Sequence, residues 1–153
     1  MRSRALLIAG MLLLGIACTP ESGAPLAVSE VRLFVPLTDK HAAVGYLTLH
    51  NQGSVPLTIE RISSTSFANI QMHETLIRDG VASMHSLPPV TIAPDASVVF
   101  AAGGKHLMLM QPTSSMAAGT AVELEIHYDS GGLVIVSAAM QDRMPAGQAD
   151  ELH

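Results

Sequence analysis

The sequence predicts an all-β domain, an antiparallel β-sandwich or Greek-key barrel of about nine short strands. Segments with alternating or β-branched apolar residues recur at intervals of roughly 8–12 residues, separated by turn-forming residues. After residue 30 no segment has the apolar periodicity of a long helix. The 153 residues are 48% apolar but only 3% aromatic, with no Trp, so Val, Ile, Leu and Ala must form the core.

The first 17 residues resemble an export signal. Two arginines precede an apolar run that is too short to span a bilayer as a helix, as in a secretory signal peptide. The only cysteine, Cys18, then ends a stretch that resembles a bacterial lipobox, although Gly15 stands where Leu is usual. Two routes are open: cleavage before an acylated Cys18, which we favour, or ordinary cleavage after Ala17 or in the small residues that follow. Both predict a periplasmic or cell-envelope location, and the first adds a lipid anchor at Cys18.

Without its leader the domain is acidic. The eight Lys and Arg residues include Arg2 and Arg4, so six remain against thirteen Asp and Glu. No basic run offsets this charge, so we expect no nucleic-acid partner. The predicted organisation is a signal peptide at 1–17, a small and polar tether at 18–29, a β domain at 30–140 and a flexible tail at 141–153.

The first half of the domain contains five predicted strands, each rich in alternating or β-branched apolar residues and each followed by turn formers. A strong hairpin signal, Asp79-Gly80, joins the last two, because the type I′ turn requires φ > 0 at both central residues. These strands are expected at 31–35, 45–50, 57–62, 68–76 and 81–87.

The second half continues the pattern with shorter strands. Pro88-Pro89 breaks the chain, Gly103-Gly104 marks a turn, and a last hairpin is expected around residues 129–132. We see no internal repeat and no domain boundary after residue 30. These strands are expected at 91–92, 97–101, 106–111, 121–128 and 133–139.

Methionine and histidine are concentrated between Met72 and Met110. This stretch holds three of the seven histidines and four of the nine methionines. If the strands flanking the Asp79-Gly80 turn pair with each other, four of these residues can lie on one face of a sheet. They are His73, Met84, His106 and Met108.

The turn at Asp79-Gly80 fixes this geometry. With two turn residues, Thr75 pairs with Met84, which makes His73 and Met84 diagonal neighbours on one face. A slip of one residue would move Met84 to the other face. Within 106–108, the first and third residues also share a face, so two imidazoles and two thioethers can point to one position.

These donors favour Cu(I). Thioether sulfur is soft and uncharged, so it prefers Cu(I) to Zn(II), Mg(II) or Ca(II), and imidazole adds a borderline donor. Thioethers also survive an oxidising compartment better than thiolates do. We therefore expect one Cu(I) per chain, bound with the moderate affinity of a neutral His2Met2 set, which suits carriage and handover.

The spacing His-x10-Met-x21-His-x-Met resembles the signature of the periplasmic copper chaperones called PCuAC. It matches without a gap at His73, Met84, His106 and Met108, and the similarity covers about residues 30–140. The resemblance implies a cupredoxin-like β-sandwich that delivers Cu(I) toward the CuA centre of cytochrome c oxidase subunit II, often alongside a Sco-type thioredoxin-like protein. It implies no enzymatic activity, and we expect a monomer.

Alternatives remain at the neighbouring residues and for the function. Met72, His85 and Met110 are either packing residues or auxiliary ligands. A blue-copper electron carrier needs a Cys thiolate, and Cys18 lies outside the domain, which opposes that class. No paired carboxylates or Ser/His/Asp set indicates an enzyme. The remaining alternative is a metal-free exported interaction sandwich, in which the Met and His residues are incidental.

Overall fold

The computed structural model describes residues 24–36 and 42–142 and confirms the all-β class, with ten strands and one short 3-10 helix in these ranges. No helix among the described residues is long and apolar enough to cross a membrane. The predicted signal peptide, Cys18 and the tail from residue 143 lie outside the described residues. The elements are β1 (Leu26–Phe34), β2 (Ala43–Asn51), β3 (Leu57–Ser63), β4 (Phe67–Arg78), β5 (Val81–Ser86), β6 (Val90–Ile92), β7 (Ser97–Phe100), β8 (Lys105–Pro112), β9 (Ala121–Tyr128), η1 (Asp129–Gly131) and β10 (Gly132–Gln141).

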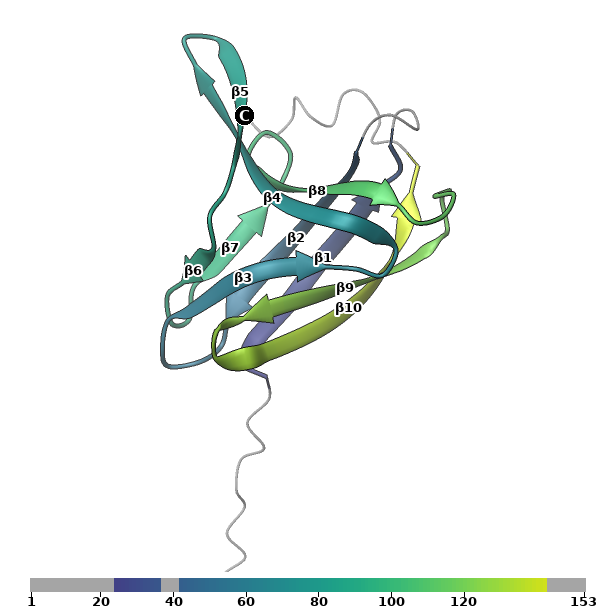
Figure 1. The fold of residues 1–153 in the computed structure, drawn as a ribbon. Helices are drawn as coiled ribbons and strands as arrows, with labels where there is room; N and C mark the ends of the chain where they lie inside the picture. The colour runs from purple at the N-terminus through teal and green to yellow at the C-terminus, as the bar shows by residue number, and fades with distance from the viewer. Residues whose placement is uncertain (1–23, 37–41, 143–153) are drawn as a thin grey trace, which may run out of the picture.

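Hydrogen bonding joins the strands in one path that folds back on itself into two layers (Figure 1). The order is β5-β4-β8-β2-β1-β10-β9-β3-β6, and β7 pairs with β2. All pairings are antiparallel except that of β1 with β10, where Leu33 lies beside Met140 and Phe34 beside Gln141. This short parallel contact connects the layer of β2, β1 and β8 to the layer of β3, β9 and β10.

An aliphatic core fills the space between the layers, as the composition predicts. Alternate residues of β9 point inward, and its Leu124 and Ile126 are fully buried in the same core cluster as Leu47 of β2 and Leu107 of β8. Burial of each such side chain stabilises the fold by about 1.5–3 kcal/mol. Met140, in the same core, is 2% exposed. Packing of aliphatic side chains therefore holds the described domain together.

The β domain begins before residue 30, so the predicted boundary with the tether is wrong. Strand β1 starts at Leu26, which is 2% exposed, and its first four residues pair with β2. A bulge interrupts β1 at Glu30, whose φ is 53°. The bulge breaks the alternation that identifies a strand, which explains why this segment resembled a tether. At the other end, β10 continues to Gln141.

Asn51 is a buried polar residue that joins two loops. Its side chain is fully buried, and its Nδ2 donates to the backbone oxygens of Val55 at 2.8 Å and Ile92 at 3.0 Å. The Ala93 oxygen lies 3.2 Å from the same nitrogen, and Oδ1 accepts the Gly53 N–H at 2.9 Å. Because every polar atom of this amide has a partner, it fixes the loops at one end of β2.

Candidate metal centre

Strands β4 and β5 form an arm that extends from the sandwich and carries two of the four predicted ligands (Figure 1). The turn residues Asp79 and Gly80 have φ values of 52° and 76°, as a type I′ turn requires. Thr75 pairs with Met84, so the predicted register of this hairpin is confirmed. His73 and Met84 are diagonal neighbours on one face of the arm.

Strand β8 brings the other two predicted ligands beside β4. His106 lies directly opposite His73, and Met108 lies opposite Gln71. Because side chains alternate along a strand, His106 and Met108 share the face of His73, while Leu107 points into the core. The structure thus brings all four predicted residues onto one face of three adjacent strands.

The two imidazole rings are close enough to bind one ion. Their centroids are 6.1 Å apart, with 48° between the ring planes. Metal–imidazole nitrogen distances are about 2.0–2.1 Å, so two rings on one ion have centroids roughly 5–6 Å apart. In addition, His73 Nδ1 is buried and has no hydrogen-bond partner among the described residues. A buried nitrogen without a partner fits a metal ligand, so the residues present suit a soft cation.

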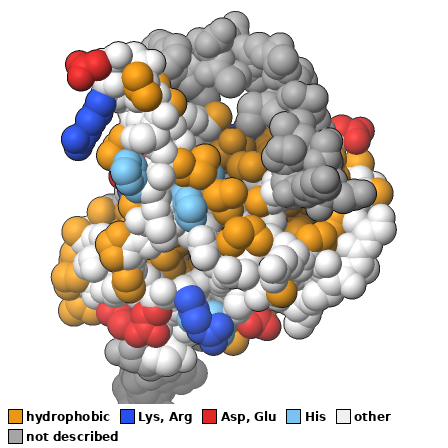
Figure 2. Space-filling model, turned by 45° about the horizontal axis from the view of Figure 1, so that its top comes forward, with side chains coloured by type: hydrophobic (Ala, Val, Ile, Leu, Met, Phe, Trp, Pro, Cys, Tyr) orange, Lys and Arg blue, Asp and Glu red, His pale blue; other side chains and the backbone are white. Residues whose placement is uncertain are grey.

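The candidate ligands differ in their access to solvent. His106 is 7% exposed and Met84 is 53% exposed, while His73 and Met108 are half-buried. The same face continues on β2, where Val44 lies beside Met108. Figure 2 shows histidine side chains (pale blue) beside hydrophobic ones (orange) on one face of the molecule. The set therefore has a buried side in apolar surroundings and an open side at Met84.

The environment keeps His73 neutral. Burial, with the His106 ring as the smaller cause, lowers the pKa of His73 from its ordinary value of 6.5. A neutral ring has a free lone pair at pH 7, which metal binding requires. The electrostatics of the site therefore agree with its geometry.

We expect the His73 ring of the metal-free chain to titrate below 6.5, as measured by NMR across a pH series. His106→Gln should raise this pKa only part of the way, because burial is the larger cause. As the pH falls, the unfolded chain takes up this proton before the folded chain does. The free energy of unfolding should therefore be independent of His73 above pH 6.5 and should decrease as the pH falls from 6.5 to the pKa of the folded state. A His73 pKa at or above 6.5 would contradict this electrostatic description.

The three flanking residues have different environments. Met72 is 8% exposed and belongs to the core, on the face opposite His73, so it is a packing residue. His85 is exposed on the other face of β5 from Met84, and its Nε2 lies 3.1 Å from Ser83 Oγ. Met110 is half-buried on the ligand face, one step beyond Met108.

The donor set is the distinctive feature of this centre. Within 24–36 and 42–142, no group of three or more His, Cys, Asp or Glu could hold a metal ion. The nearest carboxylate along β4, Glu74, points to the opposite face and pairs with Lys105 at 2.8 Å. In this part of the chain, the further soft donors on the face of His73 and His106 include the thioethers of Met84 and Met108.

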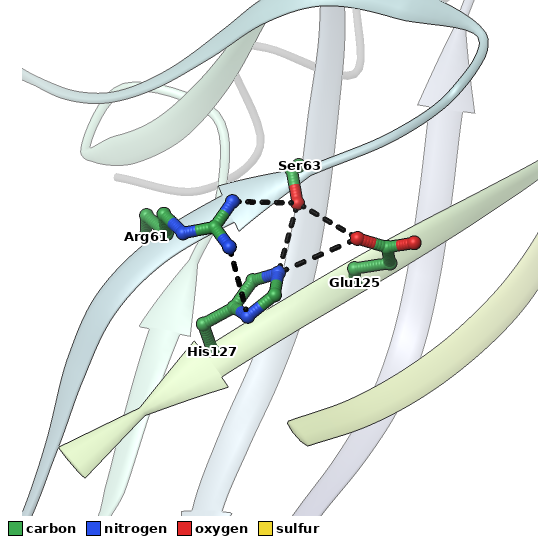
Figure 3. Close-up of polar contacts among 4 residues, drawn as sticks. All are labelled: Arg61, Ser63, Glu125 and His127. Carbon is green, nitrogen blue, oxygen red and sulfur yellow. Dashed lines mark hydrogen bonds and ion pairs between the residues drawn. The ribbon is translucent and has the colours of Figure 1, made fainter. Parts of the chain in front are cut away.

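A polar cluster on β3 and β9 resembles a catalytic triad but cannot act as one in this arrangement (Figure 3). Ser63 Oγ lies 3.0 Å from His127 Nε2 and donates to Glu125 Oε2 at 3.0 Å. Arg61 lies 3.2 Å from His127 Nδ1. Arginine only donates, so Nδ1 accepts and the ring proton is on Nε2. That nitrogen cannot accept the Ser63 proton, as a general base must, so the cluster serves to connect two strands.

The folded-over sheet with its projecting β4–β5 arm defines a cupredoxin-like β-sandwich of the PCuAC type. The copper-bound PCuAC domain from PmoF2 has a TM-score of 0.65 with this structure, at 21% identity over 78% of this chain and 95% of that one. The Cu(I) form of DR1885 from Deinococcus radiodurans has a TM-score of 0.58, at 20% identity over 77% of each chain. These similarities confirm the predicted fold.

The chain belongs to the LpqE-like family, described as "Putative lipoprotein LpqE-like", whose model matches residues 26–140. With the PCuAC fold, this match confirms the expected family relationship. "Uncharacterized protein RP573" of Rickettsia prowazekii (strain Madrid E) is 28% identical over 101 residues, which are 65% of this chain and 56% of that protein. "Putative lipoprotein Lxx21020" of Leifsonia xyli subsp. xyli (strain CTCB07) is 26% identical over 93 residues, which are 60% of this chain and 56% of that protein. The match thus spans about half the length of these curated relatives.

Proposed function

We propose that this chain is an exported copper metallochaperone that binds one Cu(I) through His73, Met84, His106 and Met108. The observation that carries the proposal is the convergence of these residues on one face, around a buried His73 nitrogen that lacks a partner among the described residues. Their soft, neutral donors suit Cu(I). Support also comes from solved structures of the same fold whose names state bound copper. In this proposal the chain carries an ion and is not an enzyme.

Transfer would proceed by ligand exchange at the open side of the centre. Met84 is 53% exposed, so a donor from a partner can approach there, whereas His106 is 7% exposed and holds the ion from within. Because no charged donor is involved, the ion is held moderately and can leave. The proposed recipient is the CuA centre of cytochrome c oxidase subunit II, reached directly or through a Sco-type thioredoxin-like protein.

The proposed location is the cell envelope, in the periplasm. The lipoprotein descriptions of the family and of the Leifsonia relative support export, in agreement with the signal-like first 17 residues. We propose Cys18 as the site of a lipid anchor. Such an anchor would keep the domain at a membrane surface.

An anaerobic titration with a chromophoric Cu(I) chelator as competitor tests the metal proposal. We expect one Cu(I) per chain and no displacement by about tenfold excess Zn(II), because two of the four donors are thioethers. Displacement by Zn(II), or more than one equivalent of tightly bound Cu(I), would contradict the four-ligand site. If no Cu(I) binds at all, the metal-free interaction domain becomes the better description.

A further inference from the structure

We infer that the two histidines bind the ion through different nitrogens, His73 through Nδ1 and His106 through Nε2, and that Gln71 positions the first ring. This inference rests on the proposed function, because it concerns the same four-ligand centre. It follows from the hydrogen bonds that each ring makes to the surrounding chain. Since the second ring nitrogen of a metal-bound histidine is commonly held by a hydrogen bond, these bonds indicate which nitrogen is left for the ion.

The Gln71 side chain determines which nitrogen of His73 carries the proton. His73 Nε2 lies 2.9 Å from Gln71 Oε1. An amide oxygen can only accept, so Nε2 is the protonated nitrogen and Nδ1 carries the lone pair. Nδ1 is also the buried atom without a partner in the described part of the chain. His73 Nδ1 is thus both the ring nitrogen with the free lone pair and the buried nitrogen without a hydrogen-bond partner among the described residues.

For His106, a backbone carbonyl determines which ring nitrogen carries the proton, and here the protonated nitrogen is Nδ1 instead of Nε2. His106 Nδ1 lies 3.0 Å from the Gly104 oxygen, which can only accept, so the proton is on Nδ1 and Nε2 carries the lone pair. The same oxygen accepts the Thr75 N–H at 3.1 Å. Thr75 is the residue that pairs with Met84. This one carbonyl therefore connects the base of the arm to the buried histidine.

Gln71 is well placed to position His73 without binding the ion itself. It lies two residues before His73 on the same face of β4 and directly opposite Met108. Its oxygen is engaged with the ring nitrogen on the far side from the inferred ligand atom. A residue that orients a ligand in this way typically changes metal affinity by about 10–100-fold when it is lost.

Long-range 1H–15N NMR of the full chain tests the nitrogen assignment. In the metal-free protein we expect the proton on Nε2 of His73 and on Nδ1 of His106. On addition of Cu(I), the 15N resonances of His73 Nδ1 and His106 Nε2 should shift most. A His73 proton on Nδ1, or the largest Cu(I)-induced shift at His73 Nε2, would overturn the assignment.

Two substitutions on β4 test the role of Gln71. Gln71→Leu removes the acceptor at an exposed position, so we expect a mixture of His73 tautomers and about tenfold or greater weakening of Cu(I) binding. Gln71→Glu keeps an acceptor oxygen and should retain the wild-type tautomer. Asn69→Leu is the matched control, because Asn69 is exposed on the same face one step farther from His73. It should leave tautomer and affinity unchanged.

The outcomes separate this inference from the function on which it rests. A wild-type chain that binds no Cu(I) overturns the proposed function. A wild-type chain that binds Cu(I), with Gln71→Leu equal to it in tautomer and affinity, overturns the role of Gln71 and leaves the proposed function standing.

Discussion

Replacing Met84 with alanine is expected to weaken Cu(I) binding by at least about 100-fold, because loss of a residue that merely orients a ligand already costs about 10–100-fold. The fold should be retained, since Met84 is 53% exposed on a strand at the end of the sheet and its truncation uncovers little core. Chelator competition under anaerobic conditions measures the affinity. Urea unfolding of the metal-free chain, measured in parallel, is expected to give an unchanged free energy of unfolding.

Ile77→Ala is the matched control for this experiment. Ile77 is 60% exposed and lies on the same face of the same arm, two pairs beyond Thr75 and Met84. It has no donor atom for a metal, so its loss should leave Cu(I) affinity at the wild-type value. Equal affinities for Met84→Ala and the wild-type chain would remove the arm from the site and contradict the four-ligand centre.

Replacing Asn51 with alanine is expected to lower the free energy of unfolding by about 3 kcal/mol, because each buried polar group left without a partner costs about 1–3 kcal/mol. The substitution leaves the buried Ile92 oxygen without its side-chain partner, and it also removes the part-buried hydrogen bonds to the Val55 oxygen and from the Gly53 N–H. Urea denaturation measures the effect as a lower midpoint with an unchanged m value.

Gln52→Ala provides the comparison, because Gln52 is the exposed neighbour of Asn51. It should change stability by no more than about 0.5 kcal/mol. Cu(I) affinity should stay at the wild-type value in Asn51→Ala, since Asn51 is at the opposite end of β2 from Val44 and Met108. An unaltered midpoint for Asn51→Ala would show that the two loops hold without this amide.

Local rules predicted the arm well. Residue type alone indicates that Asp79 and Gly80 adopt positive φ, and the period of two then places Thr75 opposite Met84 and turns His73 to the same face. The low aromatic content likewise predicted an aliphatic core. In both cases the information is local or compositional, so one sequence is sufficient.

Features that depend on distant pairing could not be predicted in this way. The sequence indicated that His106 and Met108 share a face, but the register of β8 on β4, which sets His73 opposite His106, comes from the whole sheet. Asn51 was visible only as part of a turn, because its partner Ile92 lies 41 residues away. The cluster of Ser63 and His127 joins residues 64 apart. The bulge at Glu30 concealed the start of β1 by breaking its alternation.

The place of β5 at the end of the strand path has a dynamic consequence. Within the described sheet β5 is hydrogen-bonded to β4 alone, whereas β8 is held between β4 and β2. Strands with one neighbour and few buried side chains open locally at a lower free energy than the centre of a sheet. We therefore expect Met84 to lie in a segment that opens and closes locally, and His106 in one that stays protected. Release of the proposed cargo can begin with local opening of the arm, at far lower energy than unfolding of the sandwich.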